Sequence, residues 1–193
     1  MNRLHLLILV YALGTASCTN SQSGNIKATP TETTPTLTPF HIYSNAFKEG
    51  EQIPSVYTCD SSNISPQLHW NNPFKNTVSY AIIVDDPDAP MGTWVHWVLY
   101  NIPATDTVLN THFPADTLAS NGAREGITSF GTAGYGGPCP PEGEHRYFFK
   151  IYALDFMVPY PAGLKKPQLL GVIKGHILAE ASLMGKYKRS KSR

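Results

Sequence analysis

The sequence has little net charge, no long apolar run and no internal repeat. Its 193 residues include 15 Lys and Arg against 14 Asp and Glu, a net charge of +1, so a strong nonspecific attraction to nucleic acid is not expected. The apolar run over residues 6–13 is too short to span a bilayer. The length leaves little room for two domains, and we expect one domain with terminal extensions.

Turn-forming residues, by contrast, are plentiful. The 15 Gly and 16 Pro are spread between short apolar runs, a pattern typical of turn-rich β folds. Hydrophobic residues make up 41% of the chain, enough to form a core. Strands are predicted at Tyr80–Val84, Thr93–Tyr100 and Arg146–Leu154, because these segments are rich in β-branched and aromatic residues.

One amphipathic helix is predicted near the end of the chain, after Pro167 and before Gly185. The apolar residues that recur there at helical spacing are Leu169, Ile173, Ile177, Ala181 and Met184. His176 and Glu180 would lie one turn apart, as an ordinary helix pair or a hydrogen-bonded core histidine rather than a catalytic dyad. We therefore expect a mainly β domain with a terminal helix covering part of a sheet.

The N-terminus has the layout of a secretory signal. Arg3 precedes the apolar run, and small residues lead to Cys18, as in a bacterial lipobox, whose cysteine becomes lipidated. Thr15 stands where the lipobox usually has Leu, so cleavage after Ala16, giving a soluble periplasmic or secreted protein, is the alternative. Residues 1–18 are thus predicted to be a signal peptide that leaves an exported protein anchored to a membrane of the bacterial cell envelope by lipid alone.

A polar tether is predicted to precede the folded domain. Residues 19–39 are rich in Thr, Ser, Asn and Pro and have hardly any large apolar side chain, so they cannot bury enough surface to offset the entropy of ordering. No second linker follows, and we predict a single domain over residues 40–189. Residues 190–193 belong to a basic tail that we expect to be hydrated.

The cysteines are few. Of three in the chain, Cys18 is assigned to lipidation, and Cys59 and Cys139 remain as a pair in an oxidising compartment. We predict a disulfide between them. Two separate buried thiols are the alternative, because the sequence does not give the distance on which a disulfide depends.

Ionisable groups lie where predicted strands end. Asp86 follows an apolar strand and precedes a turn stiffened by two prolines. His96 lies on a strand whose alternation would place Trp94 and Val98 on the same face. A polar residue in such a position is held beside a large aromatic ring.

A second histidine follows a loop rich in Gly and Pro. His145 would share a strand face with Tyr147 and Phe149. Two imidazoles, a phenol and glycine amides form a donor-rich site suited to phosphate or carboxylate, and Asp86 would accept a hydrogen bond from one imidazole. A single histidine is more simply interpreted as a satisfied core residue, but two that converge with such a loop favour a pocket.

Seven short strings occur in a fixed order along the chain. They are Tyr57–Asp60, Asn63–Pro66, Asp85–Pro90, Trp94–Trp97, Asn101–Pro103, Gly134–Pro141 and His145–Tyr147. Together they resemble the bacterial branch of the phosphatidylethanolamine-binding, or Raf kinase inhibitor-like, family over nearly the whole predicted domain. The resemblance implies a large antiparallel sheet packed with a smaller one, and a ligand cavity at one end.

The resemblance also implies a set of ligand-binding residues. They are Asp86, His96, His145 and Tyr147 in the pocket, with Tyr135, Gly137 and Pro140 in the loop at its rim. Beneath the pocket, we predict that Arg146 faces away from the ligand and pairs with Asp85 or Asp88.

The expected function is that of a binding module. Its pocket would take a small anion, phosphate or a phospholipid head group, and its rim would inhibit or regulate a partner enzyme. We predict no enzymatic activity, no cofactor and no metal, because the sequence has no Gly-x-Ser-x-Gly elbow and no ligand pair at a spacing typical of metal sites. A hydrolase or a metal-dependent enzyme that uses the same Asp and His residues is the alternative.

Overall fold

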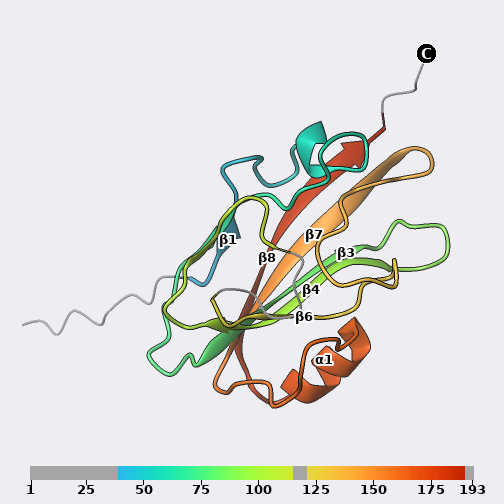
Figure 1. Ribbon diagram of the computed structural model, residues 1–193. Coiled ribbons are helices and arrows are strands. Elements are labelled where there is room, and N and C mark those ends of the chain that lie inside the picture. The colour runs from blue at the N-terminus through green and yellow to red at the C-terminus, as the bar shows by residue number, and fades with distance from the viewer. Residues whose placement is uncertain (1–38, 115–120, 190–193) are drawn as a thin grey trace, which may run out of the picture. The chain divides into compact units, whose positions relative to one another are not determined.

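A computed structural model describes residues 39–114 and 121–189 (Figure 1). The predicted signal peptide, the lipidation site at Cys18, nearly all of the tether and the predicted tail at 190–193 lie outside the described residues. No helix in the described part is long and apolar enough to cross a membrane.

Two antiparallel sheets form the fold, with the strand orders β6-β4-β3-β7-β8 and β1-β2-β5. The larger sheet contains β3 (Ser79–Asp86), β4 (Trp94–Pro103), β6 (Arg124–Glu125), β7 (Glu144–Leu154) and β8 (Ile177–Lys188). The smaller contains β1 (Ile42–Tyr43), β2 (Leu68–Trp70) and β5 (Val108–Leu109). The other elements are a 3₁₀ turn, η1 (Ser55–Tyr57), and the helix α1 (Lys166–Ile173). The predicted fold class, a large antiparallel sheet packed with a smaller one, is confirmed.

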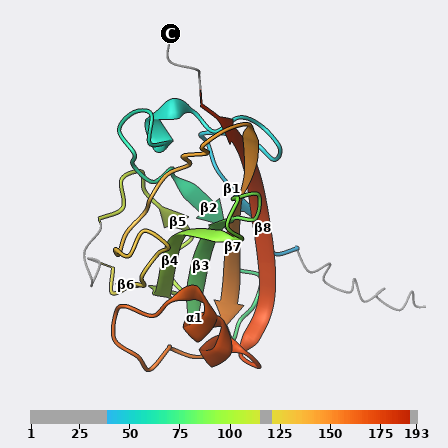
Figure 2. The same ribbon diagram turned by 90° about the vertical axis from the view of Figure 1, so that its right-hand side faces the viewer.

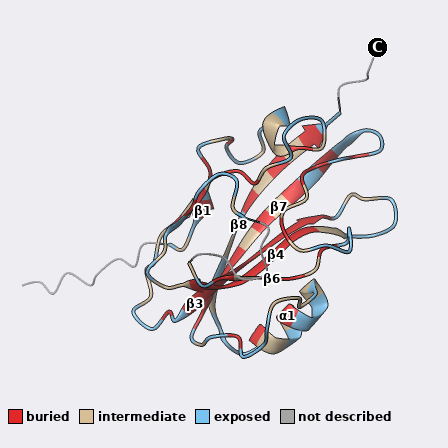
Figure 3. Ribbon diagram, viewed as in Figure 1, coloured by how far each residue is buried: buried red, intermediate tan, exposed pale blue. Residues whose placement is uncertain are grey.

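The larger sheet is covered on both faces. On one face, a core that includes Trp97, Tyr147 and Phe149 meets apolar residues of the smaller sheet. The helix α1 lies against the other face (Figure 2). Its Leu169 and Ile173 belong to a second buried cluster there. Every residue of β3 is buried, which explains its nearly continuous apolar sequence (Figure 3). The carboxylates at its end are consequently held by a strand with little freedom to move.

The helix is shorter than predicted, and the last element is a strand. α1 ends at Ile173, Gly175 turns the chain with a φ of 87°, and β8 then pairs along the whole length of β7. Within β8, Leu183, Gly185 and Tyr187 alternate on the buried side. The predicted helix through residue 184 is therefore wrong, because glycine favours a turn at this φ and pairing with β7 overrides the local apolar spacing.

The same correction moves His176 off the helix. It lies in the turn before β8, where its Nδ1 is 2.9 Å from Asp155 Oδ1 and its ring stacks on Phe156. It is not one helical turn from Glu180, which lies on β8. The expected helix pair is thus replaced by a turn contact.

Candidate functional site

A pocket of about 390 Å³ opens where β3, β4 and β7 meet at one end of the larger sheet. Asp86 ends β3, while His96 and His145 lie near the starts of its two neighbours. Because both neighbours are antiparallel to β3, their first residues lie beside its last. The ten lining residues are Asp86, Ala89, Pro90, Met91, Trp94, His96, Phe130, Cys139, Pro141 and His145.

His145 and Asp86 form a hydrogen-bonded pair at this pocket. The distance from His145 Nδ1 to Asp86 Oδ2 is 2.8 Å, and their side chains are only 8% and 4% exposed. The other carboxylate oxygen accepts the backbone N–H of Asp88 at 2.8 Å. A carboxylate can only accept a hydrogen bond, so the shared proton is on Nδ1 of His145. The second ring nitrogen, Nε2, makes no hydrogen bond within the described part of the chain. The expected bond between Asp86 and one imidazole is confirmed.

His96 is oriented by the rim loop instead of by a carboxylate. Its Nδ1 is 2.6 Å from the carbonyl oxygen of Gly136, whose N–H in turn donates to the His96 carbonyl at 2.9 Å. A carbonyl can only accept, so here too the proton is on Nδ1. Burial lowers the pKa of His96, and this effect outweighs the raising effects of the Gly136 carbonyl and of the charge on Asp86. The imidazole is therefore neutral at pH 7, with a lone pair on Nε2.

A β-bulge determines the direction in which His96 points. The pairing of β4 with β3 slips between Trp97 and Val95, which leaves His96 as an extra residue. Its ring meets that of Tyr147 edge-on at 5.2 Å, in the core between the sheets. Val98 belongs to the opposite cluster, beneath α1. The predicted alternation, with His96 and Val98 on one face, is wrong because the bulge resets it.

Tyr147 lies against the pocket without lining it. As predicted, it shares the buried face of β7 with His145 and Phe149. Its hydroxyl is buried and makes no hydrogen bond of good geometry in the described part of the chain. Burial, and secondarily the charge on Asp86, raises the pKa of this phenol, so that it keeps its proton.

Three of the predicted rim residues do not reach the pocket. The Tyr135 hydroxyl donates to the Tyr57 carbonyl at 3.0 Å, and the Gly137 N–H donates to Asn63 Oδ1 at 2.7 Å. Pro140 is buried and is not among the lining residues. The loop amides that we expected to face an anion are thus used to fasten the loop.

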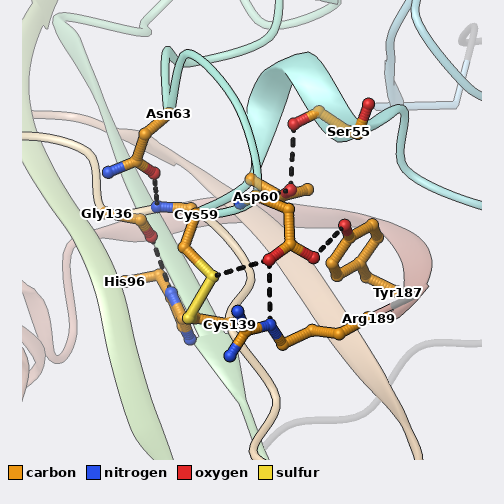
Figure 4. The surroundings of a disulfide bond; sticks show 11 residues. Ser55, Cys59, Asp60, Asn63, His96, Gly136, Cys139, Tyr187 and Arg189 are labelled. Atoms are coloured by element: carbon orange, nitrogen blue, oxygen red, sulfur yellow. Dashed lines mark hydrogen bonds and ion pairs between the residues drawn. A yellow bond between two sulfur atoms is a disulfide. The ribbon is translucent and has the colours of Figure 1, made fainter. Parts of the chain in front are cut away.

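The predicted disulfide is confirmed. Cys59 and Cys139 are bonded, with their Cα atoms 5.4 Å apart, and join the segment after η1 to the rim loop (Figure 4). Cys139 also lines the pocket.

Arg146 faces away from the pocket, as predicted, and pairs with Asp88. Its Nε and Nη2 donate to the two carboxylate oxygens at 2.9 and 2.7 Å. These bonds lower the pKa of Asp88 to about 2. Asp85, the other predicted partner, is bound instead by Lys150 and Lys166.

Sequence reasoning missed the apolar mouth of the pocket. Ala89, Pro90 and Met91 belong to the loop between β3 and β4, and Met91 is 94% exposed. Phe130 arrives from the loop after β6 and packs edge-on against His96 at 5.5 Å. An apolar residue within a glycine-flanked loop was the available signal for Phe130.

A metal site is not formed by these residues. Within residues 39–114 and 121–189, no group of three or more His, Cys, Asp or Glu side chains is placed to hold a metal ion. Asp86 and His145 are bonded to each other, and His96 is held by a backbone carbonyl.

Comparisons with known proteins agree with this architecture. Residues 43–188 match a family model described as phosphatidylethanolamine-binding protein. The UPF0098 proteins of Methanothermobacter thermautotrophicus and Aquifex aeolicus are 45% and 46% identical, over 77% of this chain and 99% and 88% of theirs. Among solved structures, E. coli YbcL, described as a new member of the mammalian PEBP family, has a TM-score of 0.73 at 34% identity, covering 78% of this chain and 99% of its own. A homolog of these proteins from Chlamydia trachomatis, CT736, has a TM-score of 0.72 at 37% identity, with 78% and 98% covered.

Proposed function

The chain belongs to the phosphatidylethanolamine-binding protein family, and we propose that it is a binding module whose pocket takes a small anionic group, that of phosphate or a phospholipid head group. The observation that carries this proposal is the anchoring of two imidazoles on the two strands that flank the end of β3. Asp86 holds Nδ1 of His145, and Gly136 holds Nδ1 of His96. Each ring therefore has its Nε2 left for a ligand in one pocket.

The protonation of these rings dictates how an anion would bind. A neutral imidazole with its proton on Nδ1 presents only an acceptor at Nε2. An anion must therefore either bring a proton, as hydrogen phosphate does, or induce one of the rings to take a proton up. The carboxylate of Asp86 would offset the charge of a protonated His145. We expect an anion that carries no proton, such as sulfate, to bind with proton uptake.

The apolar mouth supports a ligand larger than inorganic phosphate. Met91, Trp94 and Phe130 line it, so the organic part of a phosphate ester or lipid would find apolar surface there. No Ser, Thr or Lys is among the described lining residues, and the only cysteine among them is in the disulfide. The pocket thus favours binding over nucleophilic catalysis.

Two further parts of the proposal concern the setting. We place the protein outside the cytoplasm, anchored through Cys18, and the disulfide supports this because such bonds persist in oxidising compartments. The pocket rim is proposed as the surface that would inhibit or regulate a partner enzyme.

Calorimetric titration with phosphate and with phosphoethanolamine tests the pocket. His145→Ala removes one Nε2 and should weaken binding by at least about tenfold, the usual effect of losing a hydrogen bond to a charged group. His176→Ala is the matched control, because this histidine lies in the turn before β8, and it should leave binding unchanged. Equal affinity of His145→Ala and wild type for these ligands, or no heat of binding with either ligand, would contradict the proposal.

A further inference from the structure

The rim loop beside the pocket is fastened to a segment that is far from it in the sequence. Four links join residues 134–139 to residues 57–63. They are the disulfide Cys59–Cys139 and three hydrogen bonds, from Cys59 N–H to Pro138 O (3.1 Å), from Gly137 N–H to Asn63 Oδ1 (2.7 Å) and from Tyr135 Oη to Tyr57 O (3.0 Å).

The same loop sets the orientation of a pocket imidazole. Gly136 accepts the Nδ1 proton of His96 and donates its own N–H to the His96 carbonyl. Gly136 lies three residues before Cys139 in the chain, and His96 and Cys139 both line the pocket. The direction of His96 Nε2 therefore depends on where the rim loop is held.

The opposite segment is fixed independently of the disulfide. Asp60 follows Cys59, and its carboxylate accepts from Tyr187 Oη at 2.7 Å and from Arg189 Nε at 2.9 Å (Figure 4). Tyr187 belongs to β8, so this segment is tied to the edge of the larger sheet. The rim loop, whose other links to this segment are three hydrogen bonds, is therefore the side expected to shift if the disulfide opens.

We propose that the Cys59–Cys139 disulfide is a redox latch on the pocket, opened by a dithiol reductant, and that opening it weakens ligand binding by releasing the rim loop from its hold on His96. The inference rests on the proposed function for what the pocket binds. Cys139 is exposed and lines the pocket, whereas Cys59 is only partly exposed, so an incoming thiol reaches Cys139 first.

The thiol–disulfide exchange needs no oxidant or reductant other than the dithiol. A thiolate of the dithiol bonds to the Cys139 sulfur, the bond between the two cysteines breaks, and Cys59 leaves as a thiolate that takes a proton from water. The second thiol then loses its proton and displaces Cys139, which is protonated in turn. Two protein thiols and one oxidised dithiol result.

The direct test measures phosphate affinity before and after treatment of the wild-type protein with dithiothreitol, with thiol counting to verify reduction. The dissociation constant should rise about threefold to tenfold on reduction, as when one positioning hydrogen bond is lost, and return on reoxidation. Equal affinity in the two verified redox states would contradict the latch.

A single substitution distinguishes loss of the disulfide from loss of the Cys139 side chain that lines the pocket. Cys59→Ala breaks the disulfide but keeps Cys139 in the pocket, and it should bind like reduced wild type and ignore dithiothreitol. A Cys59→Ala protein that binds like oxidised wild type would contradict the proposal, and the wild-type comparison stands if this variant does not fold.

A readout without ligand distinguishes failure of the latch from failure of the proposed function. Hydrogen exchange of the Gly136 amide, which is bonded to the His96 carbonyl, should accelerate at least about tenfold on reduction. Unchanged exchange refutes the latch whatever the pocket binds. Accelerated exchange in a protein that binds no phosphate in either state refutes the proposed ligand and leaves the mechanical link intact.

Discussion

Two neighbouring carboxylates at the end of β3 lie on opposite faces of the larger sheet and have opposite roles. Asp86 points into the pocket and binds His145, an imidazole that lines the same pocket. Asp85 binds the ammonium groups of Lys150 at 2.9 Å and Lys166 at 2.5 Å, which lie outside that pocket. Both residues are buried, at 3% and 1% exposure. Burial alone therefore does not identify a functional carboxylate. The two residues differ in the side chains that bind them.

The largest effect should come from the Asp85 side of this comparison. Asp85→Asn leaves two lysines without their counter-charge, and because those side chains are 34% and 21% exposed they can partly rehydrate. We expect a loss of about 2 kcal/mol in the free energy of unfolding, below the range for fully buried pairs. Urea denaturation measures it, and phosphate affinity should stay within about twofold of wild type.

Asp86→Asn should reverse this pattern. The amide keeps the shape but removes the charge that balances a protonated His145, so phosphate binding should weaken by about tenfold or more. Stability should fall by only about 1 kcal/mol, since one hydrogen bond to His145 is weakened. If the two variants lose the same stability and the same affinity, the division of roles between the two faces is wrong.

The third expected effect is a pH dependence confined to the pocket face. In the protein without ligand, the pKa of His96 lies below the ordinary histidine value of 6.5. A bound anion should raise this pKa. Affinity is therefore highest below the free pKa and is lost as pH rises through the pKa of the complex. Sulfate, whose charge is constant in this range, should bind up to about tenfold more tightly for each pH unit that falls between these two values. A flat profile from about pH 8 to pH 5 would rule out the coupling to histidine charge.

Much of the pocket follows from the sequence, because its polar residues sit at strand ends. Antiparallel pairing brings together the strand ends that carry Asp86, His96 and His145. The cysteine pair was likewise predictable, since one of the three cysteines had a separate explanation and the other two remained.

The missed features depend on long-range geometry. The bulge that turns His96 toward Tyr147 is a slip in pairing between two strands and has no local signal. Phe130 reaches the mouth because the Val95 N–H donates to Ser129 Oγ, a contact between residues 34 positions apart. The sequence predicts helix for most of β8 because its apolar residues fit the helical and the strand period over a short window, and only pairing with β7 decides between the two.

Nitrogen NMR of the imidazole rings tests the central claim most directly. The account predicts that Nδ1 of His96 and of His145 stays protonated with and without saturating phosphate, because Gly136 and Asp86 hold those protons. It also predicts that the Nε2 resonances of both rings move toward the protonated or hydrogen-bonded position when phosphate binds, while that of His176 does not. Nε2 resonances of His96 and His145 that stay fixed at saturating phosphate would contradict it.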